Sequence, residues 1–237
     1  MACSRSLLLP IGLLTFLLSV DAAISLGLVS SMVAFLHSHG RGPFLATSSN
    51  PAGSTFLLYG EPANLATNHG HTTNGAGGTA LVLVGFGGIV ALWLERRSRK
   101  THGASSPIFH VWSLLVLLSA LLTLGALIYT FVETSLTSNQ LIDLAVAEAN
   151  PPPARYPEGR WTPETWYAAL LELPLVSADQ RGTIRGNLTI MRAWRWNLVP
   201  LFVLGFGLVV LVAVEVVRVW RREGQDVEMV EALAEGK

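Results

Sequence analysis

The sequence predicts an all-α fold: a four-helix transmembrane bundle with a helical extracytoplasmic cap made by its third loop. The chain of 237 residues contains four long apolar runs, at residues 7–36, 76–94, 108–132 and 198–220. Each run approaches or exceeds the roughly 20 residues that a helix needs to cross a hydrocarbon core of about 30 Å. Hydrophobic residues make up 51% of the chain and charged residues 14%, which is too apolar for an ordinary soluble domain. We therefore expect one multi-pass membrane unit, with the lipid bilayer as its main partner.

The first run, 7–36, permits two interpretations. Arg5, the apolar stretch behind it and Val20-Asp21-Ala22 resemble a signal peptide with a small-residue cleavage site. However, hydrophobicity resumes at once and continues to Leu36, so the stretch is about twice as long as a signal core. This favours an uncleaved signal-anchor, and either interpretation leaves the next loop on the same side of the membrane.

Positive charge in the loops predicts the orientation. The loop 95–107, after the second run, is short and rich in basic residues: Arg96, Arg97, Arg99 and Lys100. The loop 37–75 is longer, and Arg41 is its only Lys or Arg residue. Because short loops rich in Lys and Arg stay in the cytoplasm, 95–107 is expected inside, with both termini and the tail 221–237. The choice between plasma membrane and endomembrane stays open.

The two outer loops have different patterns. Loop 37–75 is rich in Gly, Ser, Thr and Asn, which indicates a flexible, irregular segment. Loop 133–197 predicts a helix over 133–149, stopped by three prolines, and a second helix that starts at Thr162-Pro163 and ends at Pro174. A third helix is expected to start at Ser177. We expect two or three short amphipathic helices lying on the outer membrane surface.

Three segments of this loop carry a resemblance. They are Trp161-Thr162-Pro163-Glu164-Thr165-Trp166-Tyr167, Leu171-Glu172-Leu173-Pro174-Leu175 and Met191-Arg192-Ala193-Trp194-Arg195-Trp196-Asn197-Leu198. Together they resemble a segment of uncharacterised four-span membrane proteins of filamentous ascomycete fungi. The resemblance implies a fungal lineage and no particular activity. Tetraspanins and claudins fit less well, because they rely on cysteines in their outer loops and this chain has one cysteine, Cys3.

Two His-x-His pairs are the sharpest candidates for chemistry. His37 and His39 follow the first run, and His69 and His71 precede the second. Antiparallel neighbouring helices would bring the two pairs together, and neutral imidazoles are good ligands for zinc and copper(II). The alternative is that all four are ordinary polar residues of a Gly/Asn/Ser-rich loop. No other cofactor is expected.

Four further positions are candidates of different kinds. Asp21 is an acid at membrane depth, where an ionisable residue is a candidate for a functional role. The alternatives are that it is protonated and hydrogen-bonded between helices, or that the long run shifts so that it lies nearer the inner interface. Asn187 begins the glycosylation sequon Asn187-Leu188-Thr189, and Cys3 is a juxtamembrane candidate for palmitoylation. Glu215 is expected to pair with Arg218 on its own helix.

Small residues occur in the second and fourth runs, at Thr79, Ala80, Gly85, Gly87, Gly88, Gly205 and Gly207. They let helix backbones approach closely, either within the protein or in contacts with membrane-protein partners or another copy of the chain.

These observations favour a non-enzymatic membrane protein with a structural or organising role. The sequence contains no nucleophile elbow, phosphate loop or pair of catalytic carboxylates. Its zero formal net charge gives no field that would recruit nucleic acid. The alternative function is a small transporter, channel subunit or metal-responsive protein that uses Asp21 and the outer histidines.

Overall fold

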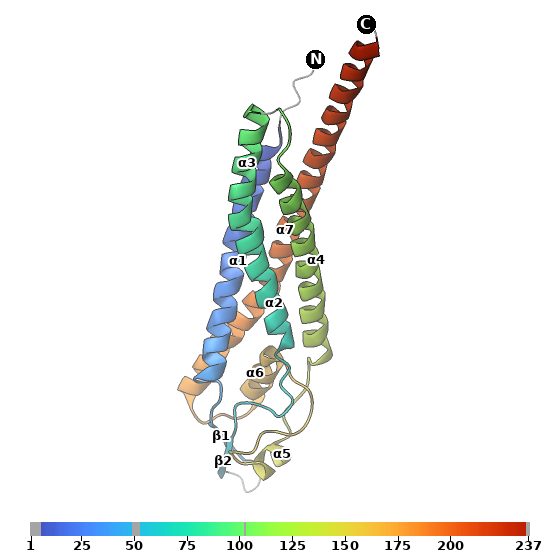
Figure 1. Cartoon of the computed structure of the whole chain (residues 1–237). Helices are drawn as coiled ribbons and strands as arrows, with labels where there is room; N and C mark the ends of the chain where they lie inside the picture. Colours follow the sequence, from blue (N-terminus) through green and yellow to red (C-terminus); the bar gives the residue numbers. More distant parts are fainter. Residues whose placement is uncertain (1–5, 49–52, 102, 236–237) are drawn as a thin grey trace. The chain divides into compact units, whose positions relative to one another are not determined.

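The computed structural model describes residues 6–48, 53–101 and 103–235, and it confirms the all-α bundle (Figure 1). Within these residues, four helical segments are long and apolar enough to cross a membrane. The first is α1 (Leu8–His37) and the third is α4 (Pro107–Leu136). The second is continuous through α2 (Asn68–Thr79), the π-helical segment η1 (Ala80–Phe86) and α3 (Gly87–Thr101). The fourth lies in α7 (Ala178–Glu235).

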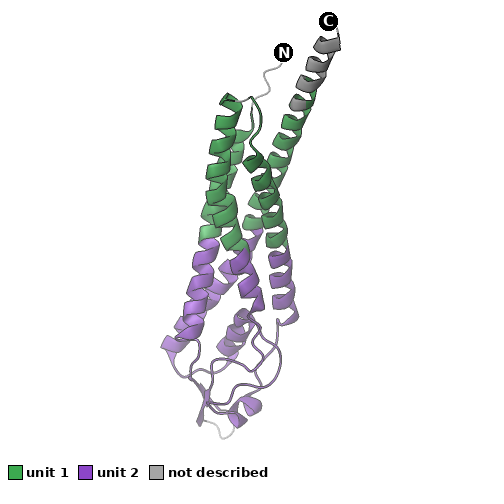
Figure 2. Ribbon diagram, in the orientation of Figure 1, with its two compact units in different colours: residues 1–23, 76–124, 200–237 green, residues 24–75, 125–199 purple. Residues whose placement is uncertain are grey.

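The chain divides into two compact units (Figure 2). Unit 1 comprises residues 1–23, 76–124 and 200–237, and unit 2 comprises residues 24–75 and 125–199. The boundaries fall inside α1, α2, α4 and α7, so every membrane-crossing segment contributes residues to both units. The described residues of unit 1 are almost entirely helical, whereas unit 2 also contains both long loops.

Close helix packing in unit 1 depends on glycines of the second segment. A Cβ atom at Gly88 would lie 3.0 Å from both Thr15 Cγ2 and Trp112 Cζ2, and one at Gly85 would collide with the Ser19 hydroxyl. The indole of Trp112 donates a hydrogen bond of 3.1 Å to the Val84 carbonyl, inside the π-helical segment. These glycines of the second run therefore serve packing within the protein.

Unit 2 contains an ordered cap, which we define as residues 38–48, 53–67 and 137–177. It includes the strands β1 (Phe44–Thr47) and β2 (Thr55–Leu58) and the helices α5 (Leu144–Ala149) and α6 (Pro163–Glu172). The two strands pair antiparallel, with Phe44 opposite Leu58. The expectation of a flexible and irregular first loop was therefore wrong. Gly/Ser/Thr-rich composition obscured a hairpin whose apolar residues Phe44, Ala46 and Leu58 enter the core.

The start of α6 confirms one local prediction. The Thr162 side chain accepts a hydrogen bond from the Thr165 amide, and the Thr165 hydroxyl accepts one from the Thr162 amide. Pro163 occupies the first turn, where its missing amide hydrogen costs nothing. The predicted helix over 133–149 is instead interrupted: α4 ends at Leu136, and α5 begins after the N-cap Asp143. Asn139, with a φ of 61°, lies in the break.

The last helix also differs from expectation. Ser177 caps it as predicted, because its hydroxyl accepts a hydrogen bond from the Gln180 amide. However, the segment after Ser177 is no separate surface helix. It is the first part of α7, a helix of 58 residues that continues into the fourth run. The helix continues through Trp194 and Trp196 and past Pro200, although proline has no amide hydrogen to donate to the carbonyl one turn earlier.

Candidate functional site

The two loops of the cap are held together by hydrogen bonds from α6. The indole of Trp166 donates to the Gly60 carbonyl at 2.7 Å, and the Tyr167 hydroxyl donates to the Gly40 carbonyl at 2.7 Å. Glycine is required at position 60, because a Cβ atom there would lie 2.6 Å from the Arg41 carbonyl carbon. Isolated β-bridges also join the two loops, one between Ala46 and Leu175 and one between Leu65 and Trp161. The cap is thus one folded structure made by both loops, whereas the sequence predicted it from the third loop alone.

Large aromatic side chains form the centre of this cap. Trp161 and Trp166 are 1% and 0% exposed, and their rings meet edge to face with centroids 5.1 Å apart. Tyr156 packs against both indoles. The same core includes Val29, Met32 and Phe35 of α1 and Ile184, Met191 and Trp194 of α7. The buried aromatic area anchors the cap on the helix ends of unit 2.

A cavity of about 530 Å³ lies within unit 2, beside the end of α1 and the start of α2. Val29, Met32 and Val33 of α1 and Leu65 of the cap give it apolar walls. Its polar residues are His37, Arg41, Glu61, His69, His71 and Asn74. The size falls within the range of about 300–1,000 Å³ that is typical of small-molecule sites. Apolar walls with a few polar groups are also typical of such sites.

His69 is the buried polar residue of this cavity. Its side chain is 2% exposed and lies against Trp194, with ring centroids 5.6 Å apart. Within the described part of the chain, its Nδ1 atom is buried and has no hydrogen-bond partner. A buried polar atom without a partner is costly, so this nitrogen is a candidate contact for a ligand.

The predicted metal site was a set of four histidines. His37, His69 and His71 line the cavity, whereas His39 does not and instead lies beside the Ser38 hydroxyl. The Nδ1 atom of His37 is bonded to the Val33 carbonyl at 2.8 Å. Among the described residues, no three His, Cys, Asp or Glu side chains lie close enough together to hold a metal ion. The structure therefore brings three of the four histidines to one cavity without assembling a metal centre.

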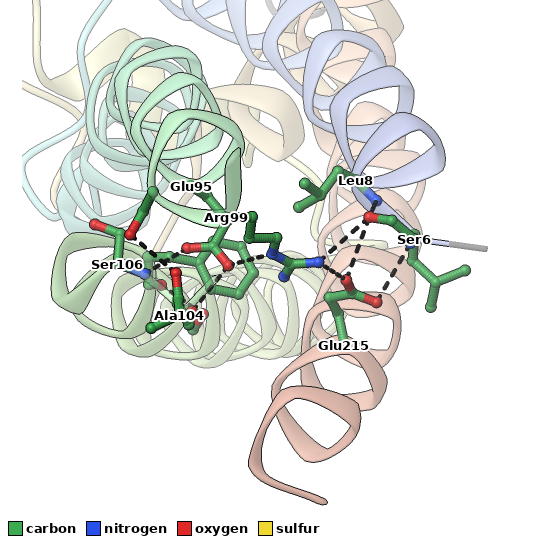
Figure 3. Close-up of polar contacts among 12 residues, drawn as sticks. Ser6, Leu8, Glu95, Arg99, Ala104, Ser106 and Glu215 are labelled. Carbon is green, nitrogen blue, oxygen red and sulfur yellow. Dashed lines mark hydrogen bonds and ion pairs between the residues drawn. The ribbon is translucent and has the colours of Figure 1, made fainter. Parts of the chain in front are cut away.

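A second polar cluster lies in unit 1, centred on Arg99 of α3 (Figure 3). Its guanidinium contacts Glu95 Oε1 at 2.7 Å and Glu215 Oε1 at 2.6 Å. Glu95 also accepts hydrogen bonds from the Ser105 hydroxyl and the Ser106 amide. Glu215 accepts hydrogen bonds from the Ser6 hydroxyl and the Leu7 amide. One cation thus joins two buried carboxylates from α3 and α7, and the neighbouring donors satisfy the remaining oxygens.

This cluster corrects the expectation for Glu215. Its carboxylate pairs with Arg99, and no ion pair of the described residues joins it to Arg218. The spacing of Glu95 and Arg99, four residues apart on one helix, was visible in the sequence and indicates a local pair. The contact with Glu215 joins residues 116 positions apart, so no local pattern contained it.

The remaining predicted positions are placed as follows. Asp21 is partly buried in α1, within unit 1. Asn187 lies inside α7 rather than in a loop, and its amide donates a hydrogen bond of 2.9 Å to the Thr183 carbonyl. Cys3 lies outside the described residues.

A cavity of about 620 Å³ lies elsewhere in unit 2, beside α6. It is lined by Glu164 and Glu172 of α6 and by Arg192 and Arg195 of α7. Arg195 contacts Glu164 at 3.1 Å and Arg192 contacts it at 3.7 Å. Burial raises the pKa of the Glu164 carboxyl, and the two arginines partly offset this rise.

No family model, curated protein or solved structure matches the chain.

Proposed function

We propose that the protein is a non-enzymatic, multi-pass membrane protein with a structural or organising role, whose cap makes the contacts with partner proteins. The interlocking of the two loops supports this most directly. Because Trp166 and Tyr167 fix the chain at Gly60 and Gly40, the surface of the cap is ordered before any partner binds. A preorganised surface loses little conformational entropy on binding.

The polar groups of the membrane-crossing helices support the same role. The hydroxyls of Thr15, Ser19 and Thr123 donate to carbonyls of their own helices at 2.7–2.8 Å. Each of these hydroxyls is thus bonded within its own helix. A transporter or channel subunit working through Asp21 would instead need a row of polar groups along a path across the membrane.

Flux measurements separate these two functions. We would reconstitute the full chain into vesicles and measure proton, sodium and potassium flux for the wild type and for Asp21→Asn. An organising role predicts flux equal to that of protein-free vesicles for both proteins. Flux above this level in the wild type, abolished in Asp21→Asn, would overturn the proposal in favour of transport.

We also propose that both termini lie in the cytoplasm and the cap outside, on the basis of the basic residues Arg96, Arg97, Arg99 and Lys100 near the end of α3. In a Cys3→Ser background, single cysteines at Arg96 and Asp179 would be tested with a membrane-impermeant maleimide on intact cells. Labelling at Asp179 alone is expected. Labelling at Arg96 alone would reverse the orientation.

A further inference from the structure

We propose that the cavity of about 530 Å³ in unit 2 binds a single-chain anionic amphiphile, with its apolar chain against α1 and its carboxylate or phosphate head beside His69, Arg41 and the start of α2. This site is independent of the organising role proposed above, which rests on the surface of the cap.

The apolar part of the ligand is inferred from the walls. Met32 and Val29 are 4% and 6% exposed, and their side chains, like those of Val33 and Leu65, consist only of hydrocarbon and sulfur. These α1 residues belong to a candidate membrane span, so the site lies on a helix that also contacts lipid. An apolar chain placed there exchanges water for side chains, which favours binding.

The cavity volume limits the size of the ligand. At roughly 30 Å³ for each small group, the share of one water molecule in the liquid, the cavity accommodates on the order of 18 non-hydrogen atoms. A single chain of about sixteen carbons with a small head is of this size. A phospholipid with two full chains is much larger.

Three features of the polar side favour an anionic head. Thr67, directly before α2, and His69 and Gly70 of its first turn line the cavity, and a helix N-terminus attracts negative charge. Arg41 supplies a full positive charge at the same cavity. Glu61 is the opposing charge, but it forms an ion pair of 3.2 Å with Arg155, which is not part of the lining.

The buried Nδ1 atom of His69 favours a bound ligand over a solvated groove. Its Nδ1 atom is buried at this helix start and has no partner among the described residues. Its ring packs against Trp194, and the residue has almost no contact with solvent. In the tautomer that carries its hydrogen on Nδ1, this N–H would donate a hydrogen bond to an anionic oxygen beside it.

The test uses the full chain in nanodiscs of zwitterionic lipid, with a photoreactive diazirine analogue of hexadecanoate. Saturable cross-links are expected on Val29–Leu36, and unlabelled hexadecanoate should compete with them. Hexadecanol, acetate and inorganic phosphate should not compete, since each lacks either the charge or the chain. Stronger competition by hexadecyl phosphate than by hexadecanoate would identify a phosphate head as the preferred form. Competition by hexadecanol as strong as that by hexadecanoate, or cross-links spread evenly over the lipid-facing helices, would overturn the proposal.

Variants distinguish specific binding from partition into lipid. Arg41→Gln changes an exposed side chain and should weaken binding about fivefold, as expected for the loss of one exposed charge contact. Arg185→Gln is the matched control, because Arg185 is an exposed arginine of the same unit outside the cavity lining, and its binding should equal the wild type. Equal binding by Arg41→Gln and wild type would contradict the anionic head. The imidazole nitrogen resonance of His69 should shift on addition of hexadecanoate, and an unchanged resonance would contradict its contact with the head.

Discussion

Arg99 and Glu215 lie in direct contact, with 2.6 Å between Nη1 and Oε1, although they come from different helices of unit 1. Glu215 is 2% exposed, so its charge is compensated mainly by this guanidinium and the two donors from Ser6 and Leu7. Buried carboxylates are stable only when paired and hydrogen-bonded. The arginine therefore neutralises the charge of Glu215 within α7, at a point where water has little access.

Replacing Arg99 by methionine should destabilise the protein by about 3 kcal/mol, because two buried carboxylates lose their shared cation. Unfolding in mixed micelles with increasing SDS would measure this change. Arg96→Met is the matched control, since Arg96 is exposed on the same helix, and it should unfold like the wild type. Equal stability of the two variants would show that the cluster contributes nothing.

Replacing Trp166 by phenylalanine should loosen the cap. The variant removes the 2.7 Å hydrogen bond to the Gly60 carbonyl, which keeps only the longer bond of 3.5 Å from the Tyr167 hydroxyl. It also removes part of the aromatic core, and the total cost is about 2 kcal/mol. Limited proteolysis should then cut within residues 38–67 faster than in the wild type. Trp196→Phe provides the control, because Trp196 is 58% exposed and lies outside the core. Similar digestion of both variants would contradict a role for Trp166 in joining the loops.

Adding one methyl group at Gly88 should destabilise unit 1 by about 1–3 kcal/mol. The alanine Cβ would press on Thr15 and on the buried ring of Trp112, neither of which has free space to move into. Gly78→Ala should instead raise stability by up to about 1 kcal/mol, because nothing lies within 4 Å of its Cβ position and alanine favours helix. Thermal unfolding of both variants measures the difference, and a change of the same sign in both would refute the packing argument.

Glu164 should make stability depend on pH. Burial raises the pKa of its carboxyl above the ordinary value of 4.5. At a pH between 4.5 and this raised pKa, the folded state therefore binds more protons than the unfolded state. The free energy of unfolding contributed by this group is therefore fully present below about pH 4.5 and falls as the pH rises through the raised pKa. Glu164→Gln removes this pH-dependent contribution to the free energy of unfolding. The stability of the wild type should fall relative to Glu164→Gln between pH 4.5 and neutral pH, and the opposite slope would contradict the raised pKa.

The fold class was predictable because length and hydropathy alone select membrane-crossing helices. Local chemistry was also sufficient at Thr162, where one residue caps its own helix, and at Ser177. The β-hairpin was missed because its pairing of Phe44 with Leu58 is stabilised by core contacts with α6 and α7 and not by its own composition.

The candidate sites were predictable only in part. The spacing of the histidine pairs suggested a shared location, and three of these residues do line one cavity. The packing of Trp194 against His69 could not be predicted in the same way, because Trp194 is distant from the histidine pairs in the sequence. The Arg99 cluster is likewise a product of tertiary structure, because Glu215 is distant in the chain.

The π-helical segment over Ala80–Phe86 has a consequence for how this membrane span faces its neighbours. An α-helix turns by about 100° for each residue, and a π-helix turns by less. The rotational phase of the residues after Phe86 is therefore offset from that of the residues before Ala80. A single helical wheel drawn through residues 68–101 assigns its two halves to inconsistent faces. The direction in which Gly88 meets Trp112 is set by this accumulated offset, so every residue of the π segment contributes to that contact, including those that touch nothing themselves.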